Sequence, residues 1–101
     1  MTTAAKMVKI ESTINQRITK NVNMIVPFYL MCSYAYYELD DPIVSDSYYD
    51  KLATKLLKEY HNIEHYHKHL IIEDDLKAGS FLGKYPSIVS DALNNFINQK
   101  G

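Results

Sequence analysis

The sequence contains no tryptophan, a single cysteine and no excess of charge of either sign. One cysteine, Cys32, excludes an internal disulfide framework and is typical of a protein that folds in a reducing compartment. The 11 basic residues are balanced by 12 acidic ones, which gives a formal net charge of -1. Such a balance argues against a general nucleic-acid-binding protein, because these proteins carry a basic excess or patch. We therefore expect no direct binding of nucleic acid.

Long apolar segments are also missing. The longest apolar run, from Met24 to Cys32, is far shorter than the roughly 20 residues that span a bilayer, and Pro27 interrupts it. Residues 1–9 lack the apolar core of a signal peptide. The chain has 101 residues, of which 47% are hydrophobic, so it can bury the core of one small domain. We expect a single domain over residues 1–101, located in the cytoplasm and not bound to a membrane.

Tyrosine is the abundant aromatic residue, with nine tyrosines against three phenylalanines. Six of the nine lie between Tyr29 and Tyr49. A core built for packing alone would use more phenylalanine or leucine, because every buried phenol oxygen needs a hydrogen-bond partner. Clustered tyrosines indicate a surface with apolar ring faces and polar tips, which is typical of interfaces and ligand sites.

Apolar residues recur at steps of three and four over residues 4–22, which predicts an amphipathic helix. Pro27 fits the first turn of a second helix, and the run Asp40-Asp41-Pro42 predicts its end. Ser45 is a good N-cap for a third helix over about 46–60. A fourth helix follows Pro86. These segments predict an all-α fold, in which an antiparallel helical hairpin is flanked by N- and C-terminal helices.

The second helix is predicted to have two different faces. Cys32 falls on its apolar face and has no basic neighbour in sequence, so we expect a buried, unreactive thiol. The other residues expected on this face are Phe28, Met31, Ala35 and Leu39. Those expected mainly on a different face are Tyr29, Ser33, Tyr36 and Tyr37.

The start of the third helix carries the best candidate for a binding site. Asp46, Tyr49 and Asp50 are spaced i, i+3 and i+4, so their side chains project from one face. Across the hairpin, Tyr36 and Tyr37 are expected to lie near this trio. Phenol rings beside paired carboxylates suit a flat cationic ring attached to a sugar, because the ring can stack and the hydroxyls can donate to the carboxylates. The alternative is that Asp46 serves only the helix start and the tyrosines belong to the core.

Four histidines lie close together at positions 61, 65, 67 and 69, and imidazole is a common zinc ligand. The cluster lacks cysteines, and only Glu64 and the pair Asp74-Asp75 could complete a metal site. We predict no metal site and interpret the segment as a polar loop. The weak candidate ligands are His61, His65, His67 and His69.

The run Tyr-x-Tyr-Tyr-x-Leu-Asp-Asp-Pro-x-x-Ser-Asp-x-x-Tyr-Asp-x-Leu, over residues 34–52, resembles the N-terminal Ia domain of bacterial NAD-dependent DNA ligases. The resemblance is strongest over 34–60 and leaves 61–101 as an unmatched extension. It implies a small helical module that closes over the nicotinamide mononucleotide (NMN) half of NAD. The contact residues that it implies are Tyr36, Tyr37, Asp46, Tyr49 and Asp50, although position 37 is His in some members of the family.

The chain also departs from that family, because it lacks the Lys-x-Asp-Gly motif of the nucleotidyltransferase centre. The resemblance therefore implies an accessory module for NAD or NMN, without catalytic residues of its own, that assists a separate adenylation subunit. Short stand-alone proteins of this kind occur in large bacteriophages. The alternative is a phage-encoded protein-interaction module that binds or inhibits a host ligase, NAD-using or defence protein. Both interpretations predict a protein partner, and a homo-oligomer is also open. An autonomous NAD hydrolase using Asp46 or Asp50 is the weakest alternative.

Overall fold

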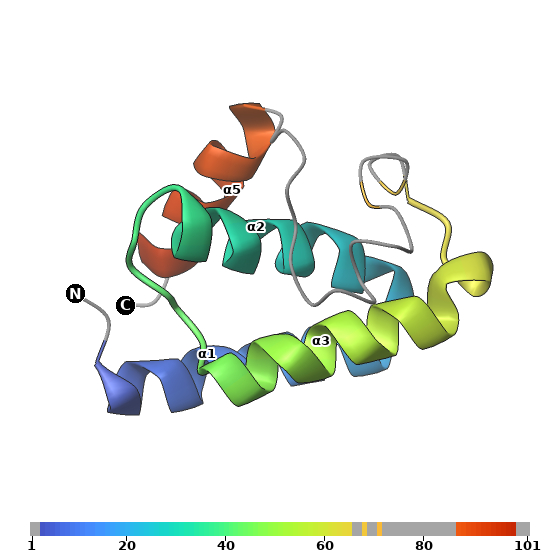
Figure 1. Cartoon of the computed structure of the whole chain (residues 1–101), viewed down its shortest axis with the longest axis horizontal. Helices are drawn as coiled ribbons and strands as arrows, with labels where there is room; N and C mark the ends of the chain where they lie inside the picture. Colours follow the sequence, from blue (N-terminus) through green and yellow to red (C-terminus); the bar gives the residue numbers. More distant parts are fainter. Residues whose placement is uncertain (1–2, 66–67, 69–70, 72–86, 99–101) are drawn as a thin grey trace.

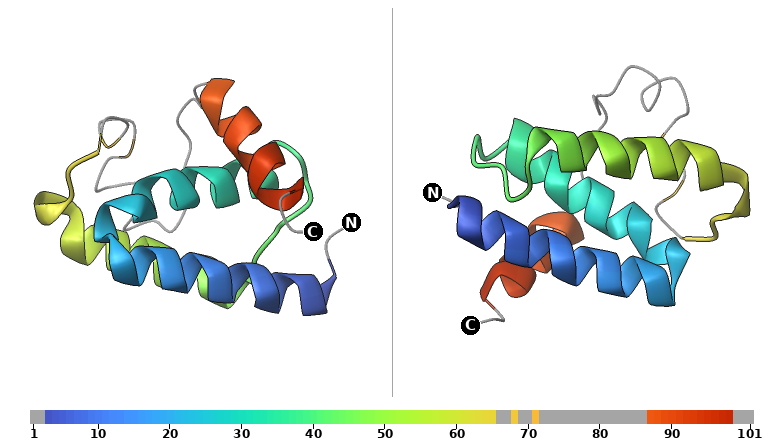
Figure 2. Two further views of the ribbon diagram at one scale, coloured as in Figure 1. Left: turned by 180° about the vertical axis from the view of Figure 1, so that it is seen from behind. Right: turned by 90° about the horizontal axis from the view of Figure 1, so that it is seen from below.

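The computed structural model describes residues 3–65, 68, 71 and 87–98. This part of the chain contains four α-helices and two short 3-10 segments but no strand, which confirms the predicted all-α fold. The second helix, α2, lies at the centre of the molecule (Figures 1 and 2). Helices α1 and α3 run along one side of it, and α5 crosses its other side.

Helix α1 spans Ala4–Lys20, close to the range that the apolar periodicity predicts. The Thr3 side chain caps it by accepting a hydrogen bond from the backbone N–H of Lys6 at 3.2 Å. Its apolar stripe is buried as expected, and the fully buried Ile14 lies at the centre of that stripe. Asn21 ends the helix in an extended conformation, and its side chain then accepts the N–H of Asn23 in the 3-10 segment η1 (Val22–Met24).

Helix α2 spans Ile25–Tyr37, and Pro27 lies in its first turn as predicted. Tyr29 and Ser33, expected on a different face from the apolar residues of α2, are as completely buried as those residues. The physical reason is that α1, α3 and α5 enclose α2 from several directions, so almost no side of its first three turns meets solvent. A helix that is buried all round must be apolar all round or pair its polar groups internally.

The helix ends three residues earlier than expected, which leaves Leu39 outside it and 47% exposed. The turn that follows satisfies the last carbonyl groups of α2. The N–H of Leu39 donates to the Tyr34 carbonyl at 3.1 Å, and the N–H of Asp41 donates to the Ala35 carbonyl at 2.9 Å. Between them, Asp40 adopts a φ of 52°, a left-handed conformation that aspartate tolerates better than most residues.

Helix α3 spans Asp46–Glu59 and runs antiparallel to α2, so the predicted hairpin is confirmed (Figure 1). Ser45 is its N-cap as predicted, with the side-chain oxygen accepting the N–H of Tyr48 at 3.2 Å. The 3-10 segment η2 (Tyr60–Asn62) continues the chain from the end of α3. No helix in the described part of the chain has the length and apolar content needed to cross a membrane.

Helix α5 spans Ser87–Asn98 and packs against α2, so the predicted C-terminal helix is confirmed. Val89 and Leu93 enter the core. Phe96 meets Phe28 of α2 edge to face, with ring centroids 5.3 Å apart. Beyond α3, the Tyr60 hydroxyl donates to the Ile71 carbonyl at 2.6 Å and so ties Ile71 to the end of that helix.

Candidate ligand-binding site

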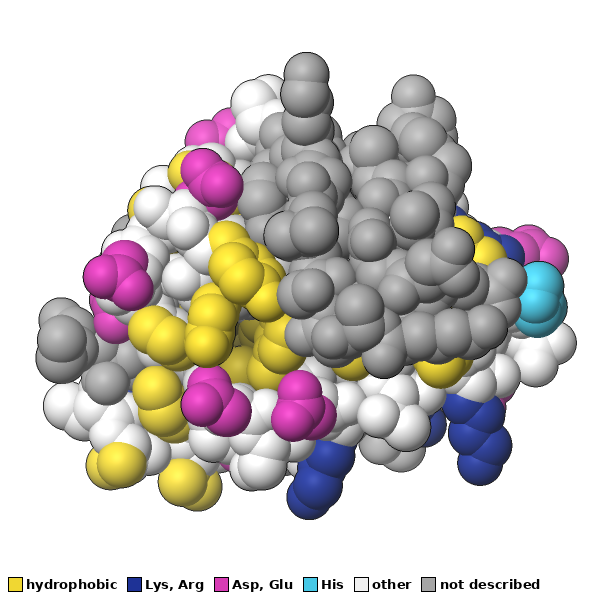
Figure 3. Space-filling view, in the orientation of Figure 1, with side chains coloured by type: hydrophobic (Ala, Val, Ile, Leu, Met, Phe, Trp, Pro, Cys, Tyr) yellow, Lys and Arg dark blue, Asp and Glu magenta, His cyan; other side chains and the backbone are white. Residues whose placement is uncertain are grey.

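Hydrophobic side chains gather beside acidic ones on the face where α2 ends and α3 begins (Figure 3). The aromatic members of this surface are Tyr36, which is 39% exposed, and Tyr37, which is 40% exposed. Their rings meet edge to face, with centroids 4.9 Å apart. Exposed phenol rings on a surface provide apolar faces for a ligand while their hydroxyls stay hydrated.

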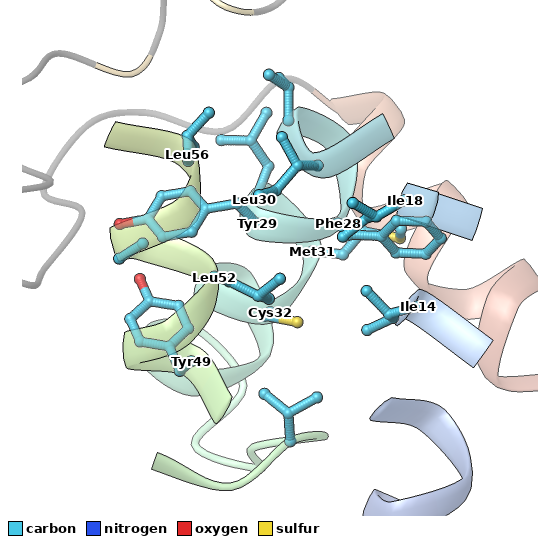
Figure 4. Close-up of a cluster of buried hydrophobic side chains, with 14 of the residues drawn as sticks. Ile14, Ile18, Phe28, Tyr29, Leu30, Met31, Cys32, Tyr49, Leu52 and Leu56 are labelled. Carbon is cyan, nitrogen blue, oxygen red and sulfur yellow. The ribbon is translucent and has the colours of Figure 1, made fainter. Parts of the chain in front are cut away.

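Three tyrosine rings form a stacked column that leads from the exposed Tyr36 into the core. The ring of Tyr49 lies between those of Tyr29 and Tyr36, at centroid distances of 5.2 and 6.1 Å, and both pairs are inclined by 15°. Figure 4 shows the rings of Tyr29 and Tyr49 one above the other beside α3. The two α2 residues are seven positions apart, so they lie two turns apart on one face. The structure therefore brings Tyr36 to Tyr49, as the sequence predicts, and Tyr37 lies beside Tyr36.

The deepest candidate, Tyr49, differs from the other site residues because it is only 6% exposed. Its hydroxyl pairs with the buried hydroxyl of Ser33 at 2.6 Å. Burial raises the pKa of the Tyr49 phenol, and the hydrogen bond with Ser33 acts in the opposite direction. The hydroxyl of Tyr49 is thus hydrogen-bonded inside the core, and its ring lies beneath the exposed ring of Tyr36. Sequence reasoning missed Ser33, because a single serine within an apolar helix carries no local signal of its partner.

The two candidate carboxylates, Asp46 and Asp50, are exposed on the first turns of α3. Within the described residues, neither carboxylate has a hydrogen-bond or ion-pair partner. The sequence around them also carries a net negative charge, because residues 21–50 contain five acidic side chains and no Lys, Arg or His. The partial positive charge at the N-terminus of α3 offsets part of the negative charge of Asp46. That partial charge is about half an elementary charge and acts only over the first turn. A surface of this kind attracts cations.

Helix α1 holds the beginning of α3 in place. The Tyr48 hydroxyl donates to the side-chain oxygen of Asn15 at 2.6 Å and lies 3.3 Å from the Glu11 carbonyl oxygen. Burial raises the pKa of Tyr48 to about 12, with the thiol of Cys32 and the carboxylate of Glu11 adding to the effect. The tyrosine next to the predicted site residue Tyr49 is therefore a structural contact. The sequence gives no local signal for it, because Asn15 and Tyr48 are 33 residues apart along the chain.

Cys32 is buried as predicted, and its sulfur lies on the side of α2 that faces Ile14 (Figure 4). Burial raises the pKa of its thiol to about 12, and the nearby Glu11 carboxylate adds to the shift. A thiol with such a pKa carries almost no thiolate at neutral pH, so Cys32 is not a nucleophile.

Two of the four histidines, His61 and His65, belong to the described part of the chain, and His67 and His69 lie outside it. His61 is exposed and contacts the Tyr60 ring edge to face, with centroids 5.7 Å apart. Among the described residues, no three His, Cys, Asp or Glu side chains are grouped so that they could hold a metal ion.

The family model described as the DNA ligase-like, N-terminal NAD+-binding domain matches residues 10–75. The match begins in α1, covers the hairpin with all five candidate residues, and ends before α5. No curated protein and no solved structure shows significant similarity to the chain. The matched range is well over half of the chain and includes the turn whose residues form the exposed aromatic and acidic surface. The chain therefore belongs to the family of DNA ligase-like, N-terminal NAD+-binding domains.

Proposed function

We propose that this chain recognises the NMN half of NAD at the surface formed by Tyr36, Tyr37, Asp46, Tyr49 and Asp50. One observation supports this assignment above the others: two exposed phenol rings, one of which stacks on Tyr49, belong to the same hairpin as two exposed carboxylates that have no partner among the described residues. This combination matches a planar cation carrying hydroxyl groups. It also agrees with the NAD+-binding description of the family.

Each part of the ligand has a chemical counterpart at this surface. The nicotinamide ring of NMN is flat and positively charged, so a phenol face attracts it by roughly 0.5 to 2 kcal/mol. Tyr36 is the better platform, because its contact with Tyr49 supports it from below. The ribose hydroxyls are donors, and Asp46 and Asp50 are acceptors without competing partners. In this assignment the ring of Tyr49 supports the ring of Tyr36 from below. The Tyr49 hydroxyl takes no part in binding, because it is bonded to Ser33.

None of the five candidate residues is basic, so none of them can pair with the phosphate of NMN. A second surface is therefore needed to neutralise it, and we propose that a separate adenylation subunit supplies this surface. Two exposed rings and two exposed carboxylates enclose a ligand poorly, and enclosure accounts for much of the affinity of small-molecule sites. The chain alone is thus expected to bind NMN weakly and to act as an accessory module without catalysis of its own.

Titration calorimetry with NMN tests the proposal. We expect binding in the millimolar range for the unmodified chain and at least fivefold weaker binding for Tyr36→Ala and for Asp46→Asn. Because the attraction depends on the charge of the ring, reduced NMN, whose ring is neutral, is expected to bind more weakly than the oxidised form. Nicotinamide riboside, which lacks the phosphate, is expected to bind at least as tightly as NMN.

Asp91→Asn is the matched control, because it removes an exposed carboxylate from α5, outside the hairpin. Its binding should equal that of the unmodified chain. Tyr49→Ala is a poor test, since Tyr49 belongs to the core and its truncation would disturb the fold. The proposal is wrong if millimolar NMN does not bind at all, or if Tyr36→Ala and Asp46→Asn both bind as the unmodified chain does.

A further inference from the structure

A carboxylate from α1 caps the beginning of α3. The Glu11 Oε2 atom accepts a hydrogen bond from the backbone N–H of Ser45 at 2.8 Å, across a separation of 34 residues. In a capping box this N–H is satisfied by a Glu or Gln three positions after the N-cap, on the same helix. Here that position is Tyr48, which cannot perform this function. Glu11 therefore completes the cap from a neighbouring helix.

A second pair of contacts lies one turn further along both helices. The side-chain oxygen of Asn15, one turn after Glu11 on α1, accepts a hydrogen bond from the Tyr48 hydroxyl at 2.6 Å. Tyr48 is also the residue whose backbone N–H is bound by the Ser45 side chain. The residues before and within the first turn of α3 are thus fixed to α1 by a carboxylate and by an amide. Neither contact involves the exposed side of the turn, which carries Asp46.

This arrangement changes the task of Asp46. An aspartate in the first turn of a helix often serves the helix itself, either by its charge or by bonding to an N–H of that turn. In this structure the Ser45 side chain accepts the N–H of Tyr48, Glu11 accepts the N–H of Ser45 itself, and the Asp46 carboxylate has no partner among the described residues. Asp46 is therefore available to a ligand, and Glu11 holds the backbone position from which its side chain extends.

We propose that Glu11 is a positioning residue for the NMN site: by holding the backbone of Ser45 it sets Asp46 and Asp50 relative to Tyr36. This inference rests on the proposed function. Glu11 itself lies on α1, and we assign it no contact with the ligand. Replacing Glu11 should therefore weaken NMN binding by more than the accompanying loss of overall stability explains.

The test compares Glu11→Ala and Glu11→Gln with the unmodified chain, using NMN affinity by calorimetry, the thermal midpoint, and the Ser45 amide signal in a 15N NMR spectrum. For Glu11→Ala we expect the Ser45 amide to shift and affinity to fall by about tenfold, as for the loss of a hydrogen bond to a charged group. Glu11→Gln keeps an acceptor oxygen and should recover part of the affinity.

Two controls separate positioning from general destabilisation. Glu59→Ala removes a glutamate at the opposite end of α3 and should leave affinity unchanged. Val89→Ala truncates a buried side chain of α5 and should lower the thermal midpoint at least as much as Glu11→Ala, again without changing the affinity.

The outcomes distinguish this inference from the proposed function. If the unmodified chain binds NMN and Glu11→Ala binds equally well, the positioning role is wrong and the proposed function stands. The role is also wrong if Val89→Ala loses as much affinity as Glu11→Ala. If the unmodified chain does not bind NMN, the proposed function is wrong, and the positioning role is overturned with it.

Discussion

At the scale of single residues, the hydroxyl pair of Ser33 and Tyr49 is the contact on which the candidate site depends. It is buried, it spans α2 and α3, and it holds the ring on which Tyr36 stacks. Ser33→Ala would leave the Tyr49 phenol without this partner in a site that solvent barely reaches. We expect the free energy of unfolding to fall by about 1 to 3 kcal/mol, as for other buried groups that lose a partner.

Urea unfolding measures this change, and the double variant Ser33→Ala with Tyr49→Phe identifies its origin. Removing both hydroxyls should cost less than the sum of the two single changes, because neither member of the pair then remains without the other. Thr54→Ala, which removes an exposed hydroxyl from α3, is the control. Equal stability of Ser33→Ala and the unmodified chain would contradict the assigned importance of the pair.

The residues of the site differ in how far sequence could identify them. Asp46, Tyr49 and Asp50 follow from helical spacing within a single segment, and the structure places Tyr36 against Tyr49. Ser33 and Glu11 could not be identified in this way. Their partners lie 16 and 34 residues away, and no local pattern encodes which distant N–H or hydroxyl a buried polar group will meet. The ligand assignment of all five site residues stays a prediction.

At the scale of elements, the sequence predicts the helices better than it predicts their surroundings. Caps and prolines are local features, so the starts of α2 and α3 agree with expectation. The near-complete burial of the first three turns of α2 has no local signal in the sequence. Ser33 was expected on a different face from the apolar residues, and the enclosing helices bury it there, where its hydroxyl pairs with that of Tyr49. The end of α2 was placed too late because proline marks only the latest possible boundary.

The contribution of α5 can be tested directly, because it lies beyond the residues that the family model matches. Leu93 of this helix is fully buried. Leu93→Ala removes apolar contacts and leaves a cavity, so we expect the free energy of unfolding to fall by about 2 to 5 kcal/mol. The measurement is chemical unfolding followed by circular dichroism. Asn94→Ala, at the adjacent exposed position, should have a small effect; a similarly small effect of Leu93→Ala would show that α5 does not stabilise the domain.

At the scale of the whole molecule, two buried acids predict how stability depends on pH. The pKa of the Cys32 thiol is raised from 9.0 to about 12, and that of the Tyr48 phenol from 10.0 to about 12, mainly by burial in both cases. Above pH 9 the unfolded chain begins to lose these protons while the folded chain keeps them. Since the unfolded state then binds fewer protons, the stability present at neutral pH is lost progressively between about pH 9 and pH 12.

Thermal midpoints measured from pH 7 to pH 12 test this dependence. We expect a decline that starts near pH 9, with a shallower slope between pH 10 and pH 12 for Tyr48→Phe, which has no ionisable hydroxyl. Tyr36→Phe is the matched control, because Tyr36 is exposed and should leave the slope unchanged. A midpoint that stays constant through pH 12, or equal slopes for Tyr48→Phe and the unmodified chain, would contradict the prediction.

The buried hydroxyl pair also restricts how α2 and α3 can align. Apolar side chains of similar volume can often replace one another, so an interface built only from them tolerates several registers. Sliding α3 by one turn would bring Ala53 opposite Ser33, and the two hydroxyls would lose each other. Such misaligned packings are disfavoured by the cost of an unmade buried hydrogen bond. The pair of hydroxyls therefore favours one register of α3 against α2, and in that register the rings of Tyr36 and Tyr49 are in contact.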